Sequence, residues 1–241
     1  MISSNRGLRP KTTGGLRPAL TGASRAARAI SLIPTVFLSL ALAGPGHAQQ
    51  SALAPEAAKQ FIVAMGDRAV KLLADTGYAK KRNENFALLM VDAIDFDSLA
   101  LATLGRMART ASGPDKKEFA RLFAAHVIDV AIERFGNLQV AKVDTGNLRA
   151  MPNGNVIVNT RIERVNDAPL SVDWRVHKAQ PEGRASGPLI NDIEVEGYSL
   201  AIHYRGEFER AGVSTVQGLI AKLRGMTDKS PILHVVQQRM P

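Results

Sequence analysis

The sequence contains no cysteine, and this absence excludes several classes of protein. Without thiols the chain has no disulfide framework, no thiolate metal site, no cysteine nucleophile and no lipid anchor on cysteine. It also lacks the run of ~18 or more apolar residues that a membrane-spanning helix needs. Because 45% of its residues are hydrophobic, the chain can still bury a substantial core. We therefore expect a soluble globular protein.

Acidic residues are missing from the first part of the chain, residues 1–48. The net charge of +9 falls to +3 when the six basic residues of this segment are left out. These are Arg6, Arg9, Lys11, Arg17, Arg25 and Arg28. The basic character therefore lies mainly in this segment, and a nucleic-acid-binding function loses its main support.

The same segment has the three parts of a secretory signal. A basic region is followed by an apolar run over residues 30–43 and then by small residues at Gly46 and Ala48. We expect cleavage after Ala48, which leaves residues 49–241 as a single exported domain. A leader with arginine and serine but no acid also resembles a mitochondrial transit peptide, although the uninterrupted apolar run favours secretion.

Side chains with catalytic or metal-binding chemistry are sparse. No two of the five histidines have the spacing of a metal site such as H-x-x-x-H. Phosphate-binding loops and the glycine pattern of dinucleotide-binding proteins are absent as well. We therefore expect neither a metal nor a cofactor.

The first half of the exported part has the periodicity of amphipathic helices, with apolar residues three and four positions apart. Proline suits the first turn of a helix, aspartate and serine suit its cap, and glycine its end. Ser112, with Asp115 three residues further on, has the pattern of a capping box. We expect a first helix from Pro55 to near Gly77 and a shorter one over residues 86–93. A third helix should be capped by Asp97, and the longest should run from Ser112 to Gly136.

Beyond this point the period changes to two, which indicates strands over residues 156–163, 170–177 and 190–196. The links between them are too short for crossover helices, so the sheet should be antiparallel. After Gly197 a helix should follow, and Ser214 with Gln217 should cap a last helix that ends at Gly225. The tail from Thr227 has no clear period. This order predicts an α+β fold, with helices packed on one face of a curved antiparallel sheet.

Several short motifs resemble those of a known family. Residues 196–200 read Glu-Gly-aromatic-Ser-Leu, and residues 204–208 read Tyr-Arg-Gly-Glu-Phe. A Gly-(x)5-Gly-Leu-Ile-(x)2-Leu pattern covers residues 212–223, and residues 104–112 read Leu-Gly-Arg-Met-Ala-Arg-Thr-Ala-Ser. On these motifs residues 55–225 are similar to MlaC-type proteins, also called the toluene-tolerance family.

MlaC-type proteins are periplasmic phospholipid-binding proteins that carry lipid between the two membranes of Gram-negative bacteria. The resemblance implies the same role here, in support of outer-membrane lipid asymmetry. Its implied partners are an inner-membrane ABC transporter with a lipid-binding ring protein and an outer-membrane lipoprotein complex. It also implies an apolar cavity between helices and sheet that holds two acyl chains. The residues expected to line this cavity are Leu104, Met107, Phe119, Phe123, Val127, Val172, Trp174, Val176, Leu200, Tyr204 and Phe208.

Other functions remain open at this stage. The cargo of such a carrier could be a hopanoid or another polycyclic lipid. Gly197-Tyr198-Ser199-Leu200-Ala201 resembles a hydrolase nucleophile elbow, and Asp228 and His234 follow in the order of a triad. An elbow of that kind belongs to a parallel sheet, whereas the strands here predict an antiparallel one, so we expect no enzyme. A periplasmic interaction module with a solid core is the third possibility.

Overall fold

The computed structural model describes residues 52–75, 77–135, 140–165, 167–179 and 186–240. The predicted leader, the predicted helix end at Gly136 and the predicted turn at residues 181–183 lie outside these ranges. No helix in the described ranges is long and apolar enough to cross a membrane.

The helices predicted for the first half of the exported part are present, but some of them begin or end at other residues than expected. Pro55 occupies the first turn of its helix, and the Ser112 hydroxyl accepts a hydrogen bond from the Asp115 backbone at 3.1 Å. The predicted cap at Asp97 is wrong, because Asp95 caps that helix and accepts from the Ser98 backbone. The elements are α1 (Pro55–Ala74), α2 (Ala79–Ala93), α3 (Phe96–Leu104), the 3-10 helix η1 (Gly105–Arg109) and α4 (Gly113–Phe135).

The sheet has five strands, each antiparallel to its neighbours, in the order β1-β2-β3-β4-β5. The antiparallel topology confirms the prediction. The first strand was not predicted, because Gly146 and several polar residues interrupt the alternation of its sequence. The strands are β1 (Val140–Ala150), β2 (Val156–Arg164), β3 (Asp167–Ala179), β4 (Gly187–Val195) and β5 (Tyr198–Ser199).

A tight turn at Glu196 and Gly197 joins β4 to the short strand β5. Both residues have positive φ, 50° and 83°, as the two-residue turns that suit the twist of a hairpin require. Glu196 is held in this conformation from both sides. Its carboxylate accepts a hydrogen bond from the Ser171 backbone at 2.6 Å, and its own backbone N–H donates to the Ser171 carbonyl at 3.0 Å.

After β5 the described residues form three helices, which are α5 (Leu200–Arg210), α6 (Val216–Thr227) and α7 (Leu233–Arg239). The predicted cap at Ser214 is wrong by one residue, since the Thr215 hydroxyl accepts from the Gly218 backbone at 3.1 Å. The predicted end at Gly225 is also too early. Helix α7 was missed altogether, because a helix of seven residues is too short for its period to show in the sequence.

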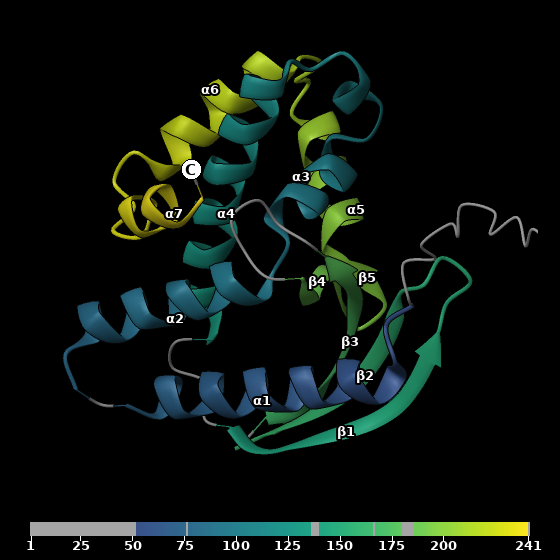
Figure 1. Ribbon diagram of the computed structural model, residues 1–241. Coiled ribbons are helices and arrows are strands. Elements are labelled where there is room, and N and C mark those ends of the chain that lie inside the picture. The colour runs from purple at the N-terminus through teal and green to yellow at the C-terminus, as the bar shows by residue number, and fades with distance from the viewer. Residues whose placement is uncertain (1–51, 76, 136–139, 166, 180–185, 241) are drawn as a thin grey trace, which may run out of the picture. The chain divides into compact units, whose positions relative to one another are not determined.

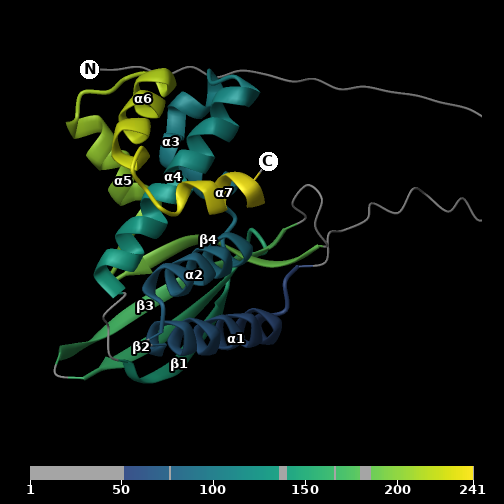
Figure 2. The same cartoon turned by 90° about the vertical axis from the view of Figure 1, so that its left-hand side faces the viewer.

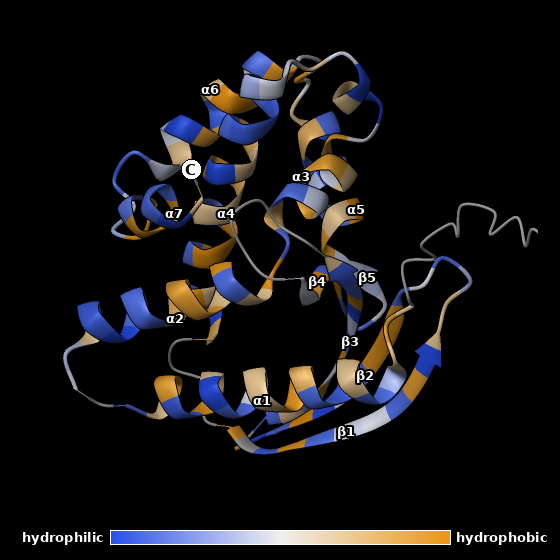
Figure 3. Ribbon diagram, viewed as in Figure 1, coloured by the Kyte–Doolittle hydropathy of each residue, from blue (hydrophilic) through white to orange (hydrophobic). Residues whose placement is uncertain are grey.

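Helix α1 lies along the hollow side of the curved sheet, with α2 stacked on α1 (Figures 1 and 2). Helix α4 is in contact with α3, α6 and α7, and α5 packs against α3. Buried apolar side chains of the helices and of β2 to β4 form one cluster. Figure 3 shows that apolar and polar residues are interspersed along these elements. The predicted α+β fold is confirmed.

Candidate functional site

One face of the sheet is apolar and buried beneath α1. The register places Val158 opposite Trp174 and Val156 opposite Val176, so these side chains share a face. Val156, Val158 and Val176 are at most 1% exposed. The opposite face carries polar side chains such as Asn159 and Asp173. Alternation along β2 and β3 therefore directs the apolar side of the sheet toward the helices, as the sequence predicts.

A polar pair lies within this apolar face. The indole N–H of Trp174 donates a hydrogen bond to the Thr160 hydroxyl at 2.9 Å, across the β2–β3 pair. Thr160 is 2% exposed, and its own hydroxyl donates to the Val172 carbonyl at 3.4 Å. Because both side chains find partners, neither leaves an unpaired donor in the apolar surroundings. The pair fixes the orientation of the indole ring on the face that looks toward α1.

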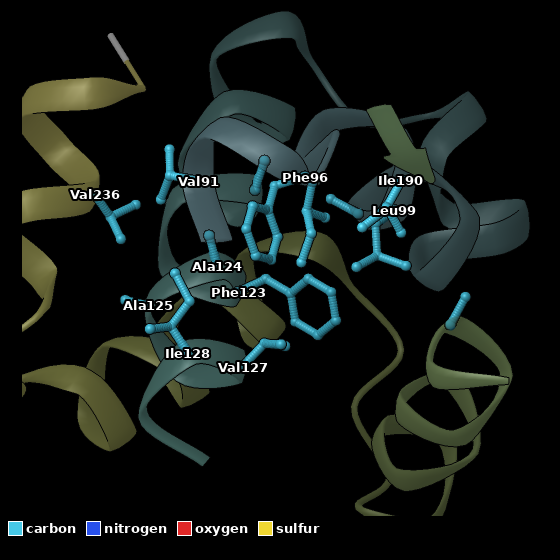
Figure 4. Packing of buried hydrophobic residues seen from close by; sticks show 14 of the residues in the cluster. Val91, Phe96, Leu99, Phe123, Ala124, Ala125, Val127, Ile128, Ile190 and Val236 are labelled. Carbon is cyan, nitrogen blue, oxygen red and sulfur yellow. The ribbon is translucent and has the colours of Figure 1, made fainter. Parts of the chain in front are cut away.

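A second apolar group is an aromatic cluster between α4 and α5. The rings of Phe119 and Phe123 stack with their centroids 5.6 Å apart, and Tyr204 meets Phe123 edge-on at 5.1 Å. The ring centroid of Phe208 lies 6.1 Å from that of Phe119. Such offset and edge-to-face pairs add to the stability that the buried area already provides. Phe119 and Phe123 are fully buried, and Figure 4 shows Phe123 among the packed side chains of the core.

The structure divides the predicted cavity residues into two groups. Four of those on helices, Phe119, Phe123, Tyr204 and Phe208, form the aromatic cluster, and Met107 and Leu200 are only partly buried. Those on β3 lie on the sheet face beneath α1. Val176 belongs to the same buried cluster as the helical residues, and Trp174 packs against that cluster. That these residues line a lipid cavity stays a prediction. The helical group is Leu104, Met107, Phe119, Phe123, Val127, Leu200, Tyr204 and Phe208, and the sheet group is Val172, Trp174 and Val176.

An open cleft lies between α1, α2 and α7 and has a volume of about 510 Å³. Its apolar wall consists of Leu72, Leu88 and Leu89, and Leu88 is 39% exposed. Leu88 is thus a large apolar side chain left open to solvent within a concave surface. The sequence did not predict this cleft, because Leu88 falls outside the apolar period that indicated the helix over residues 86–93. The other lining residues are Arg68, Lys71, Asn85, Asp92 and Arg239.

The family follows from comparison with known proteins. Residues 58–225 match the family model described as MlaC protein. The chain belongs to the MlaC family. No curated protein matches the chain significantly.

A solved structure similar to this MlaC-family chain is that of a phospholipid-binding protein from Ralstonia solanacearum, in complex with a phospholipid. The TM-score is 0.59, and the match covers 76% of this chain and 99% of that one. Their sequences are 19% identical, so the likeness establishes a shared fold. The family model ends before α7, and the cleft residue Arg239 therefore lies outside the part that it describes.

Two of the MlaC-like motifs meet in space, and their contact explains two of their residues. Gly105 ends α3 with a φ of 56° that favours glycine, and a Cβ there would lie 3.0 Å from the Arg205 guanidinium. Arg205 donates to the carbonyls of Ala102 and Thr103 in the last turn of α3. The glycine of the first motif and the arginine of the second thus join α3 to α5, which is a structural role.

Ser199 has the surroundings of a helix cap rather than of a nucleophile. Its hydroxyl donates to the Asp192 carboxylate at 2.7 Å and accepts from the Ile202 backbone at 3.3 Å. His234 lies on α7, with its imidazole 3.8 Å from the Glu84 carboxylate on α2. The structure therefore gives the serine and the histidine of the suggested triad different partners in different elements.

We predict that Ser199→Ala lowers the free energy of unfolding by ~1–2 kcal/mol, because α5 loses its cap. Any hydrolysis of p-nitrophenyl esters should be the same for the variant and the wild type. Urea unfolding and an esterase assay measure the two effects. Turnover that disappears with this one substitution would show that Ser199 is a nucleophile.

Titratable side chains also lie where α4 meets α5 and the segment before α7. Burial lowers the pKa of His126, although the nearby Asp129 opposes this shift. Burial raises the pKa of Asp129, although a hydrogen bond from Ser230 opposes it. In the described ranges, no group of three or more His, Asp or Glu side chains is placed to hold a metal ion.

Proposed function

We propose that the protein is a periplasmic phospholipid carrier, exported by removal of residues 1–48. The observation that carries the proposal is the cleft between α1 and α2, which combines a leucine wall with basic side chains on a domain of the MlaC family. A phospholipid has the matching chemistry, with apolar chains and a phosphate at one end. The phospholipid bound to the Ralstonia solanacearum protein of the same fold supports this choice of ligand.

Binding a lipid in this way needs no covalent chemistry, but release is demanding. Each buried methylene contributes ~0.8 kcal/mol, so two acyl chains contribute on the order of 20 kcal/mol before costs, near the limit for non-covalent complexes. Spontaneous release would be too slow for a carrier. We therefore propose that the lipid is transferred while the protein is docked to a membrane partner. These partners would be an inner-membrane ABC transporter with a lipid-binding ring protein and an outer-membrane lipoprotein complex.

The cleft should admit the lipid, and the buried residues predicted at the outset should surround its chains once helices and sheet separate. Helix α1 is central to this proposal, because it borders the cleft on one side and covers the apolar face of the sheet on the other. The cleft has a volume of about 510 Å³ and is open to solvent. Chains longer than the cleft would have to pass beneath α1, toward Trp174 and Val172.

The test is the lipid content of Leu88→Glu, purified from the periplasm of its own host. A carboxylate beside the acyl chains must be desolvated or excluded, which costs several kcal/mol and should lower lipid occupancy by more than ~10-fold. Folding should be unaffected, because Leu88 is 39% exposed. Ile202→Glu is the matched control, since Ile202 is an exposed residue of α5 outside the cleft, 67% accessible.

Mass spectrometry of extracted lipid and of the intact complex measures the occupancy. We expect phospholipid in the wild type and in Ile202→Glu, and little in Leu88→Glu. A polycyclic lipid in place of phospholipid would identify the alternative carrier. No lipid in the wild type would mean an interaction module, and equal occupancy in both variants would place the lipid elsewhere.

A further inference from the structure

The mouth of the cleft has a charge distribution that its leucine wall does not require. Of the ionisable side chains that line the cleft, Arg68, Lys71 and Arg239 are cationic and Asp92 is anionic. Arg68 and Lys71 are exposed and lie three residues apart on α1, so they share one side of the helix. The lining therefore has an excess of two positive charges next to an apolar wall.

The third cation is held in place by tertiary contacts. Helix α7 is anchored by Ile232, Val235 and Val236, which are at most 6% exposed, and it packs against α2 and α4. At its C-terminal end the Arg239 guanidinium donates a hydrogen bond to the Asp92 carboxylate at 2.8 Å. This bond fixes the direction of the arginine at the cleft and leaves its other N–H groups able to donate. Asp92 also raises the pKa of Arg239 above its ordinary value.

We propose that this mouth binds the phosphate of a phospholipid whose headgroup has a net negative charge, and that it disfavours zwitterionic headgroups. The inference deepens the proposed function and rests on it. Arg68 and Lys71 on α1 would contact the phosphate from one side and Arg239 from the other. An ammonium group in the headgroup would meet the same cations and be repelled, whereas a neutral glycerol headgroup would not.

The expected discrimination is moderate, because the cations are exposed to solvent. A contact between exposed charges typically changes an equilibrium by about two- to fivefold. Two or three of them should enrich an anionic over a zwitterionic lipid by about tenfold at low ionic strength. The enrichment should decline as salt screens the charges. Total lipid occupancy should not depend on these residues, because the acyl chains provide most of the binding free energy.

The experiment incubates the delipidated protein with vesicles of equimolar phosphatidylglycerol and phosphatidylethanolamine that have identical acyl chains. Native mass spectrometry then gives the ratio of the two bound lipids. The test variant is Arg68→Gln with Lys71→Gln. The matched control is Lys80→Gln with Lys81→Gln, which removes the same charge from the exposed start of α2, outside the cleft. A parallel sample contains glycerol phosphate as a soluble competitor.

We expect a ratio near ten for the wild type and the control, near two or below for the test variant, and no effect of glycerol phosphate. A ratio of one in the wild type with lipid bound overturns the headgroup site and leaves the carrier function intact. An equal fall in both variants indicates general attraction to the vesicle surface and also overturns it. Competition by glycerol phosphate would assign the site to free phosphates. A wild type that binds neither lipid refutes both proposals.

Discussion

Replacing Phe123 with alanine is expected to lower the free energy of unfolding of the lipid-free protein by ~3–5 kcal/mol, the usual cost of truncating a buried phenylalanine. The ring is fully buried and contacts Phe119, Tyr204 and Phe208. Its removal leaves a void that side chains of α4 and α5 fill only in part. Urea unfolding monitored by circular dichroism measures the loss.

The same experiment decides what the aromatic cluster does. Tyr78→Ala is the control, because this ring is 74% exposed and its removal should change stability by less than ~0.5 kcal/mol. A similarly small loss for Phe123→Ala would mean that the ring borders a cavity already open in the lipid-free protein. The lining role predicted from the sequence would then be correct for the helical group.

The second large effect is expected at Asp95, where the helices meet the sheet. Its backbone N–H donates to the Ile190 carbonyl at 2.8 Å, and its carboxylate accepts two bonds from Ser98. The same carboxylate lies 2.9 Å from the imidazole of His177 on β3. We expect Asp95→Ala to lower the free energy of unfolding by ~2–4 kcal/mol, as α3 loses its cap and His177 its partner.

The contribution of Asp95 should depend on pH in a defined direction. Burial raises the pKa of the carboxyl, but the contacts with His177 and Ser98 outweigh burial and hold it below its ordinary value. A lowered folded pKa means that the stabilisation is complete above the unfolded pKa of about 4 and is lost as the pH falls through the folded pKa. The difference in stability between wild type and Asp95→Asn should therefore shrink as the pH falls below ~4. A difference that grows below pH ~4 would contradict this account.

Much of the fold could be predicted because the signals are local. The start of α1 at Pro55, the cap at Ser112 and the alternation along β2 and β3 depend on residues a few positions apart. Where the local signal is weak, prediction failed. The alternation of β1 is interrupted, and α7 is too short to show a period. Both elements form because their neighbours β2, α2 and α4 offer surfaces to pair with or pack on.

The candidate site was beyond the reach of local patterns. Its lining brings Arg68 of α1 and Asp92 of α2 together with Arg239, which follows them by well over a hundred residues. Leu88 is 39% exposed and the next residue, Leu89, is 3% exposed, because successive side chains point about 100° apart around a helix. The apolar period of α2 leaves Leu88 outside the buried face, but it does not show that α1 and α7 form a cleft beside this residue.

The sequence by itself determined the class of the fold, the antiparallel sheet and the membership in a family, because helix caps, hydrophobic periods and short motifs act within a few residues of each other. The tertiary structure alone decided which apolar side chains are packed solid and which stay open, and that Gly105 and Arg205 serve a helix end. It also decided that three distant cations share one cleft. Those outcomes depend on contacts between segments far apart in the chain, and such contacts form only when the elements have packed.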